Sequence, residues 1–357
     1  MKLAAVVRAL GVDSSLDYRI VHTGQHYDPS MTDVFFEELG IPAPAVYLEV
    51  GSGSHGAQTA RIIERYEAHL LQTPPDGTVV FGDVNSTVAC ALAAVKLGVP
   101  VAHVEAGLRS FDRTMPEEIN RLLTDALADL LLVSEPSGVV NLRREGVAEE
   151  KVHLVGNVMI DTLLHQLPAA RVRATARRLG LEPGRFGLVT LHRPSNVDDD
   201  ATLAMLLDLL HEIAGELPLV FPVHPRTSAA ARRAGLGDRL TEDRDRLLCV
   251  SPLPYLETLS LLADARVVLT DSGGLQEETT ALRVPCLTLR ENTERPITVE
   301  KGTSRLVGND PARIRAAIAD LRSGTWAAGE EVALWDGRAG ERVVACLVAW
   351  MQQRGAH

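Results

Sequence analysis

The sequence predicts an α/β protein made of two doubly wound units, each built on a parallel sheet. Short apolar runs, which are typical of buried strands, alternate along the whole chain with longer segments of helical periodicity. The chain has 357 residues, more than one hydrophobic core usually supports. Polar or glycine-rich turns follow several of the apolar runs in both halves, as expected where parallel strands end beside a ligand.

Each half contains its own series of elements. Strands are expected at residues 18–24, 78–83, 99–106, 130–135 and 151–156, and then at residues 186–192, 218–224, 245–251, 265–271 and 284–289. Helices are expected between them, for example at residues 59–71, 85–98, 116–127, 201–215 and 254–265. We therefore expect an N-terminal domain at 1–160, a C-terminal domain at 161–335, and a final helix within 336–357 that could pack back on the N-terminal domain.

Composition and charge exclude several function classes. The net charge is −11 and no long basic run is present, which argues against a general nucleic-acid binder. No apolar stretch is long enough to span a bilayer and the start does not resemble a signal peptide, so we expect a cytoplasmic protein. The four cysteines are scattered and form no CxxC or Cys/His spacing, which favours buried thiols. His103 and Glu105 could share a metal ion, but no third ligand stands at a telling spacing, so no metal site is expected.

Three carboxylates stand where a predicted strand ends or a predicted helix begins. Asp83 ends one strand, Glu105 lies at the end of the next, and Glu117 falls in the first turn of a helix. Because ligands bind at the carboxyl ends of parallel strands, these acids suit acid/base chemistry at one crevice. Attraction to the helix dipole is an alternative for Glu117, but it explains the other two less well. The helix that carries Glu117 has one apolar face, formed by Ile119, Leu122, Leu123, Ala126 and Leu127.

The second half carries the signals of an anion site. Ser272, Gly273 and Gly274 lie between a predicted strand and a helix, where glycines let backbone N–H groups approach an anion. A plain tight turn would explain this motif equally well if it stood alone. Basic and imidazole side chains stand at other strand ends and in a loop, and they suggest a diphosphate pocket: His192, Arg193, His224, Arg226, Arg290 and Arg295. Glu278 lies about one turn into the helix, within reach of a ribose diol, although it could also be a surface acid.

These motifs together resemble one family. Residues 23–28 (TGQHYD), 82–87 (GDVNST), 103–121 (HVEAGLRSFDRTMPEEINR), 156–162 (GNVMIDT), 192–196 (HRPSN), 271–278 (DSGGLQEE) and 293–296 (TERP) follow the order seen in non-hydrolysing UDP-N-acetylglucosamine 2-epimerases. The resemblance runs from the first residues to about Gly308. It implies a fold similar to GT-B enzymes, with two Rossmann-like domains and the active site in the cleft between them.

The resemblance also implies an activity and roles for single residues. Family members epimerise UDP-GlcNAc to UDP-ManNAc at C2, by elimination and re-addition of UDP, without a cofactor or a metal. They serve cell-surface polysaccharide biosynthesis and form homodimers. By motif, the catalytic residues are Asp83, Glu105, Glu117 and His192. The substrate-binding residues are Lys2, Gln25, His26, Arg121, Arg193, His224, Ser272, Gly273, Gly274, Glu278 and Arg295. Which acid removes the proton and which returns it stays open.

The sequence departs from the family pattern at its start and in one loop. Family members open with a strand and a GTRPE-like loop before a helix similar to residues 1–10, so we expect the first strand and the loop arginine to be absent here. Their absence would leave a seam in the first sheet, because a missing strand leaves its neighbours without ladder partners. A longer form with that strand would be more stable and more active. Residues 51–55 (GSGSH) also differ from members that their own substrate activates, so substrate activation is not expected.

Several other functions remain open. A hydrolysing relative would release UDP and free ManNAc from the same acids. A related epimerase would act on a UDP-diacetamido sugar. A two-domain glycosyltransferase would use the DSGGLQEE segment but would not need the three acids. Absence of the arginine loop would also fit a sugar-nucleotide-binding protein without activity.

Overall fold

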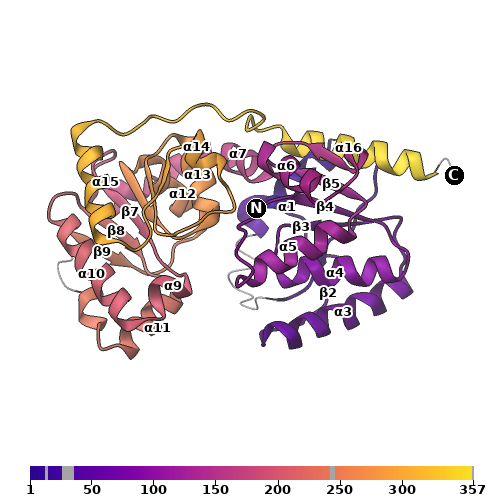
Figure 1. Ribbon diagram of the computed structural model, residues 1–357, viewed down its shortest axis with the longest axis horizontal. Helices are drawn as coiled ribbons and strands as arrows, with labels where there is room; N and C mark the ends of the chain where they lie inside the picture. The colour runs from indigo at the N-terminus through magenta and orange to yellow at the C-terminus, as the bar shows by residue number, and fades with distance from the viewer. Residues whose placement is uncertain (13–14, 26–35, 242–245, 356–357) are drawn as a thin grey trace. The chain divides into compact units, whose positions relative to one another are not determined.

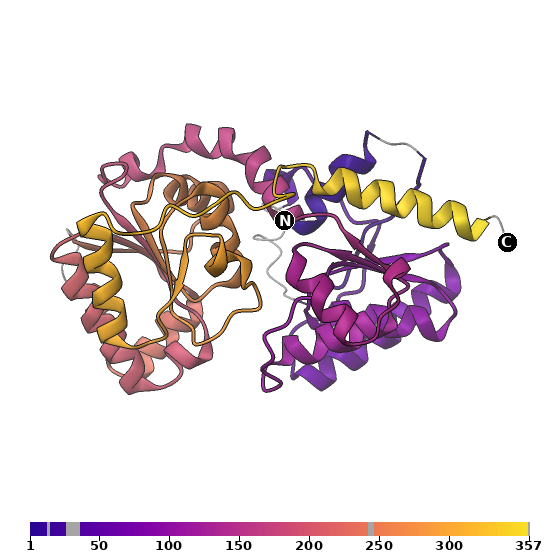
Figure 2. The same ribbon diagram turned by 45° about the horizontal axis from the view of Figure 1, so that its top comes forward.

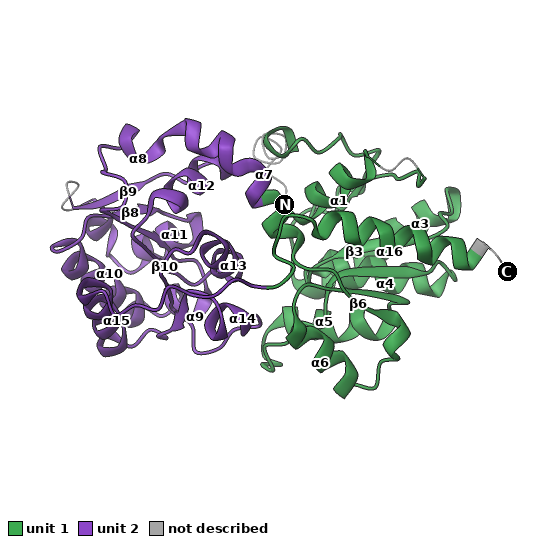
Figure 3. Cartoon of the chain, turned by 90° about the horizontal axis from the view of Figure 1, so that it is seen from above, with its two compact units in different colours: residues 1–162, 333–357 green, residues 163–332 purple. Residues whose placement is uncertain are grey.

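The computed structural model describes residues 1–12, 15–25, 36–241 and 246–355. The chain divides into two compact units, shown in Figure 3: unit 1 comprises residues 1–162 and 333–357, and unit 2 comprises residues 163–332. Each unit contains parallel strands packed against helices, so the predicted α/β class with parallel sheets is confirmed. Within the described ranges, no helix combines the length and the apolar character that crossing a membrane requires.

Unit 1 carries its strands in two parallel sheets. The smaller sheet pairs β1 (Val21–His22) with β2 (Val46–Tyr47), and the larger has the order β3 (Thr78–Phe81), β4 (Val101–Ala106), β5 (Leu130–Val133) and β6 (Val152–Leu154). The helical elements, labelled in part in Figure 1, are α1 (Lys2–Leu10), α3 (His55–Gln72), α4 (Asn85–Lys96), α5 (Pro116–Leu127), α6 (Pro136–Arg144), the short η1 (Glu149–Lys151) and α16 (Ala339–Gly355).

The larger sheet of unit 1 is covered on both faces. Helices α3, α4 and α6 contribute Ile62, Ala91 and Leu142 to one apolar cluster. Helices α1 and α16 contribute Val6 and Val343 to the opposite cluster, and Figures 1 and 2 show α16 running beside α1. The C-terminal helix thus belongs to the core of unit 1.

The sheet of unit 1 is interrupted between β1 and β3. In the described part of the chain, β1 pairs with β2 and β3 pairs with β4, and no ladder joins β1 to β3. Side chains connect the loop after β1 to the start of α4: the hydroxyls of Thr23 and Ser86 are 2.8 Å apart, and Gln25 Oε1 accepts the Ser86 N–H at 3.1 Å.

Helix α5 buries its polar side and exposes its apolar side. Ile119 and Leu123, part of the apolar face found in the sequence, are 44% and 50% exposed. An apolar stripe on a helix ordinarily faces the core. Here the opposite side faces the sheet, because its polar residues bond to the ends of β3 and β4 as described below. These buried residues are Glu118, Asn120, Arg121, Thr124 and Asp125.

Unit 2 has one parallel sheet of six strands. Their order is β12 (Ser304–Leu306), β11 (Cys286–Thr288), β10 (Val267–Thr270), β7 (Gly187–Thr190), β8 (Leu219–Pro222) and β9 (Leu247–Val250). The helical elements are α7 (Val158–Arg173), which enters the unit from unit 1, α8 (Thr175–Arg178), α9 (Pro194–Val197), α10 (Asp200–Ala214), α11 (Pro225–Arg233), η2 (Gly237–Leu240), α12 (Tyr255–Asp264), α13 (Gly273–Leu282), α14 (Ile297–Glu300) and α15 (Pro311–Ser323).

The strand order of unit 2 defines where a ligand site should form. The order runs one way from β7 to β9 and the other way from β10 to β12, so β7 and β10 flank the topological switch point. Ligands of doubly wound sheets bind at the carboxyl ends of the strands beside such a point. Leu207 and Ile318 belong to the apolar cluster on one face of the sheet, and Leu163 and Leu259 belong to the cluster on the other.

Candidate active site

The ends of β3 and β4 bring two of the predicted acids to one edge of the unit 1 sheet. The strands are parallel neighbours with Phe81 opposite Val104, and the Gly82 N–H donates to the Val104 carbonyl at 3.0 Å. Asp83 directly follows Gly82, and Glu105 directly follows Val104. Asp83 and Glu105 therefore lie at matching positions near the carboxyl ends of two neighbouring strands.

Glu105 occupies an uncommon backbone conformation. Its φ is +73°, and the register of β4 against β5 shifts between Val104 and Ala106, so Glu105 is the residue of a β-bulge. Bulges re-aim side chains beside functional sites, and a left-handed residue other than glycine costs about 1–3 kcal/mol. The carboxylate is buried and forms an ion pair with the Lys2 ammonium of α1. Lys2, a predicted substrate-binding residue, thus contacts one of the predicted catalytic acids.

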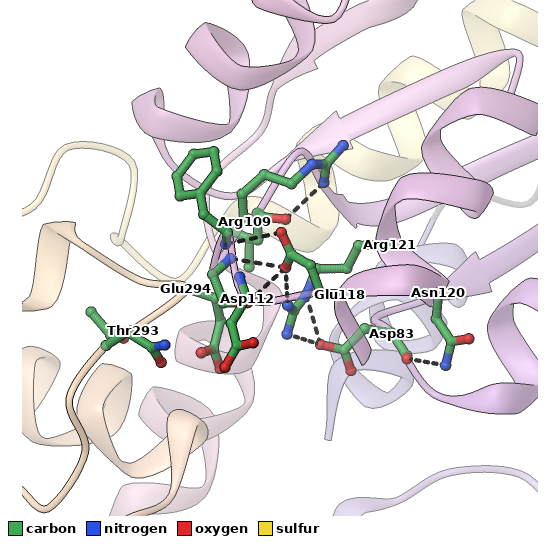
Figure 4. Close-up of polar contacts among 12 residues, drawn as sticks. Asp83, Arg109, Asp112, Glu118, Asn120, Arg121, Thr293 and Glu294 are labelled. Atoms are coloured by element: carbon green, nitrogen blue, oxygen red, sulfur yellow. Dashed lines mark hydrogen bonds and ion pairs between the residues drawn. The ribbon is translucent and has the colours of Figure 1, made fainter. Parts of the chain in front are cut away.

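Arg121 ties Asp83 to helix α5. Its guanidinium contacts Asp83 Oδ2 at 2.6 Å and Glu118 Oε2 at 2.7 Å, as Figure 4 shows. The neighbouring Asn120 donates its amide to the Asp83 carbonyl at 2.9 Å. Arg121 is only 2% exposed, so a buried guanidinium holds Asp83 in place.

The two glutamates at the start of α5 have different environments. Glu118 is buried, and its carboxylate accepts the N–H groups of Ser110 (2.9 Å) and Phe111 (3.0 Å). It therefore fixes the loop between β4 and α5. Glu117 lines a cavity of about 330 Å³, and neither Asp83 nor Glu105 is among the residues that line it. Residues around this cavity include Gln25, His55, Asn85 and Asn120.

The predicted residue Gln25 lies at the same cavity, whereas His26 lies outside the described residues. Gln25 Oε1 accepts the Ser86 hydroxyl at 2.6 Å, and its carbonyl accepts the amide of Gln58 at 3.1 Å. These contacts join the loop after β1, helix α3 and the start of α4. Gln25 and Glu117 are thus brought together by packing, although 92 positions separate them.

In unit 2, a buried carboxylate organises the residues at the switch point. Asp271, which directly follows β10, accepts the backbone N–H groups of His192 (2.9 Å) and Arg193 (2.8 Å). It also contacts the Nδ1 atom of the His192 ring at 2.9 Å. Burial alone would raise the pKa of Asp271, but the His192 ring and the two backbone donors lower it below its ordinary value. The ionised carboxylate therefore fixes His192, whose side chain is 38% exposed and can meet a ligand.

His224 stands beside His192. Their ring centroids are 5.4 Å apart, and His224 Nδ1 accepts the Arg226 N–H at the start of α11. Burial, the neighbouring His192 and Arg226 lower the pKa of His224, although Asp271 opposes them. Arg226 itself turns to Asp198, with a contact of 2.5 Å.

The glycine-rich turn begins helix α13. Ser272 is the N-cap residue, and Gly273 and Gly274 form the first turn, where backbone N–H groups lack helical partners. A Cβ on Gly273 would lie 2.6 Å from Glu294 Oε1 and 2.9 Å from the Arg295 guanidinium. A larger residue at this position would therefore displace the Glu294 and Arg295 side chains.

Two arginines of the predicted anion pocket are paired with buried glutamates. Arg295 contacts Glu277 Oε1 at 2.9 Å and also pairs with Glu294. Arg290 contacts Glu294 at 2.7 Å. These glutamates offset the charge of both arginines, so the basic character of this region is smaller than the count of arginines suggested.

Glu278 is a buried residue of α13, so the alternative of a surface acid is wrong. It is 5% exposed, and the Tyr255 hydroxyl donates to its Oε1 atom at 3.1 Å. Burial raises the pKa of Glu278 to about 7, and the hydroxyl of Tyr255 limits this rise. The carboxyl is thus poised between its two protonation states near neutral pH.

Sequence reasoning missed the acids that support the site. Asp271 ends a strand just before the glycine-rich turn, which is the signal that identified Asp83, and it could have been found in the same way. Glu118 and Asp125 lie on a helix whose polar side would ordinarily face water. Only their partners on other elements show that they are structural.

Carboxylates at the strand ends of one doubly wound unit, and a histidine beside a glycine-rich helix start in the other, define a two-unit α/β enzyme. The sequence profile of the UDP-N-acetylglucosamine 2-epimerase family matches residues 8–348. The UDP-N-acetylglucosamine 2-epimerase of Methanocaldococcus jannaschii is 42% identical over 355 residues, which cover 97% of this chain and 95% of the relative. The chain belongs to the UDP-N-acetylglucosamine 2-epimerase family.

Two further proteins are similar to this chain over most of its length. The crystal structure of the Methanocaldococcus jannaschii enzyme in complex with UDP-GlcNAc and UDP matches with a TM-score of 0.90 and 41% identity, covering 98% of this chain and 96% of that one. The UDP-2,3-diacetamido-2,3-dideoxy-D-glucuronate 2-epimerase of Pseudomonas aeruginosa is 42% identical over 311 residues, covering 86% of this chain and 85% of the relative.

The raised pKa of Glu278 predicts a pH dependence of stability. In the folded protein this carboxyl keeps its proton up to about pH 7, whereas its ordinary pKa is 4.5. The folded state therefore binds more protons between these values, and the contribution of Glu278 to the free energy of unfolding falls as the pH rises through this window. Glu278→Gln removes this titration. As the pH increases from about 5 to about 8, we expect the melting temperature of the variant to rise relative to that of the wild-type protein. A difference that does not change with pH would contradict the assignment.

Proposed function

We propose that this protein catalyses the reversible epimerisation of UDP-GlcNAc to UDP-ManNAc at C2, by elimination and re-addition of UDP. The observation that carries the proposal is the pair Asp83 and Glu105, held at the ends of neighbouring strands by Arg121 and Lys2. This pair occurs in a chain that is 42% identical to a UDP-N-acetylglucosamine 2-epimerase over 97% of its length.

The reaction needs groups that move a proton at carbon. In the first half, the C2–H and C1–O bonds break, a C1=C2 double bond forms, and UDP leaves with the electron pair of the C1–O bond. A carboxylate takes the C2 proton. In the second half, C2 is protonated on the other face and UDP adds back to C1. Two acids in different orientations suit the two faces, and Asp83, Glu105 and Glu117 are the candidates.

Unit 2 supplies the nucleotide site in this proposal. The N–H groups in the first turn of α13, at Gly273 and Gly274, lack partners within the helix and, with Ser272, suit the diphosphate. Arg193, His224 and Arg295 complete the set assigned to the phosphates, and His192 is the catalytic histidine beside them. Since Arg295 is paired with Glu277 and Glu294, its role would include holding the start of α13. Glu278 accepts the ribose hydroxyls when it is ionised.

A second substrate has its own support. The Pseudomonas aeruginosa relative, a UDP-2,3-diacetamido-2,3-dideoxy-D-glucuronate 2-epimerase, is as similar in identity as the UDP-GlcNAc enzyme, although over a shorter length. The chemistry at C1 and C2 would be the same. The two candidate substrates differ in their substituents at C3 and C6 of the sugar, so an assay of both is needed to choose between them.

The proposed reaction is tested by proton NMR in deuterium oxide. We expect the wild-type protein to convert UDP-GlcNAc to a mixture with UDP-ManNAc, with solvent deuterium at C2 of both sugars. UDP-2,3-diacetamido-2,3-dideoxy-D-glucuronate, assayed in parallel, should react more slowly. Release of free ManNAc would show the hydrolysing reaction. No change in either sugar nucleotide would contradict the proposal.

The acids are tested by conservative substitution. Asp83→Asn, Glu105→Gln, Glu117→Gln and His192→Ala should each lower turnover by about 10²- to 10⁴-fold, because a general acid or base contributes a factor of this size. Glu67→Gln, an exposed acid on α3, serves as the matched control and should keep wild-type turnover. Turnover near the wild-type value in any two of the carboxylate variants would refute the proposed set.

We also propose that the protein is a homodimer, with the exposed apolar face of α5 in the contact between copies. Ile119, Leu123 and Ala126 give this helix an outward apolar stripe that one copy could bury against another. In sedimentation, wild type should behave as a dimer and Leu123→Glu as a monomer, because the charge would enter an apolar contact. Val172→Glu, at an exposed valine of unit 2, is the control and should remain dimeric. A monomeric wild type, or a dimeric Leu123→Glu variant, would contradict this.

A further inference from the structure

His103 lies in the interior of unit 1, in the middle of β4. Its side chain is fully buried, and it points to the same side of the sheet as helix α5. Its Nδ1 atom is 2.6 Å from Asp125 Oδ1, and its Nε2 atom is 2.8 Å from the carbonyl oxygen of Gly82. Both ring nitrogens therefore face oxygen atoms.

The hydrogen bonds indicate that the ring is an imidazolium cation. A carbonyl oxygen can only accept, so Nε2 must carry a proton. The other partner, Asp125, accepts the Gly107 N–H at 3.0 Å and contacts Arg109 at 2.7 Å through its second oxygen. Because both of these groups donate hydrogen bonds to Oδ2, they favour an ionised Asp125 whatever the charge of His103. An ionised Asp125 accepts at both oxygens, so Nδ1 also carries a proton.

The charges around this pair are balanced. His103 and Arg109 are the cations, Asp125 is the anion between them, and Arg109 also contacts Glu145 at 2.6 Å. Lys2 pairs with Glu105 close to Gly82. Removing one member of such a buried ion pair destabilises the protein, because an uncompensated charge is left in the interior.

The pair holds the backbone beside both proposed acids. The His103 ring fixes the carbonyl of Gly82, the residue before Asp83. Asp125 fixes the N–H of Gly107, two positions after Glu105. Both glycines have positive φ values, +67° and +80°, and a Cβ on Gly107 would lie 2.5 Å from the Gly138 carbonyl oxygen. One buried ion pair thus fixes the backbone conformation of two turns, those at Gly82 and Gly107.

We infer that the buried His103–Asp125 ion pair positions Asp83 and Glu105 for proton transfer, without touching the substrate. This inference rests on the proposed function, because it assigns a purpose to the turns that carry the proposed acids. It makes His103 and Asp125 positioning residues. Their loss should lower turnover and leave nucleotide binding unchanged, since the nucleotide is assigned to unit 2.

The charge state is tested on the wild-type protein without substrate. Nitrogen-15 NMR of histidine-labelled protein should show both His103 ring nitrogens protonated at neutral pH, with assignment by the His103→Gln variant. A spectrum of a neutral ring, with one protonated nitrogen, would overturn the inference. This measurement does not depend on activity, so it separates a failure of the inference from a failure of the proposed function.

The positioning role is tested by kinetics with UDP-GlcNAc. Asp125→Asn should lower kcat by about a hundredfold, the loss expected from a misplacement of about 1 Å, with KM and the affinity for UDP unchanged. Glu145→Gln removes a charge at the outer end of the same network and is the matched control, with kcat near wild type.

A double variant keeps the test decisive if Asp125→Asn folds poorly. In His103→Gln/Asp125→Asn, the two amides can bond to each other and still serve Gly82 and Gly107, while Arg109 keeps its pair with Glu145. We expect it to recover melting temperature and part of kcat relative to either single variant. Wild-type kcat in Asp125→Asn, or equal losses of kcat and of UDP affinity, would overturn the positioning role.

Discussion

The contact between the polar side of helix α5 and the ends of β3 and β4 is the constraint on which unit 1 depends. Arg121 and Asn120 hold Asp83, Asp125 holds His103 and Gly107, and Glu118 holds the loop between β4 and α5. Such buried groups are stable only together, because breaking one pair costs about 3–5 kcal/mol. Because the polar side of α5 is buried, its apolar side faces outward. The position of the site residues and the proposed contact between copies therefore both follow from the orientation of this helix.

Both units use a buried aspartate to fix a histidine and the backbone near it. Asp125 accepts from His103 and the Gly107 N–H, and Asp271 accepts from His192 and the Arg193 N–H. The difference lies in exposure. His103 is fully enclosed, whereas the side chain of His192 is 38% exposed. The same device therefore positions backbone in unit 1 and presents an imidazole to a ligand in unit 2.

The sequence predicted the sheets well because their strands are continuous apolar runs. It did not identify β2 and β12, which have only two and three residues and leave little periodicity to detect. Periodicity also found the apolar stripe of α5 but not its direction, since that depends on partners such as His103 and Asp83, far away in the sequence. Acids at strand ends were recognisable, whereas Glu118 and Asp125 became recognisable only from their contacts.

The most direct test of the account is a crystal structure of the wild-type protein with UDP-GlcNAc bound. The account requires the C2 carbon of the sugar to lie within reach of a carboxylate oxygen of Asp83 or Glu105, at about 3–3.5 Å, the distance at which a near-attack geometry forms. The diphosphate should lie at the N-terminus of α13, beside His192. A sugar ring placed away from both carboxylates, with the nucleotide bound elsewhere, would contradict it.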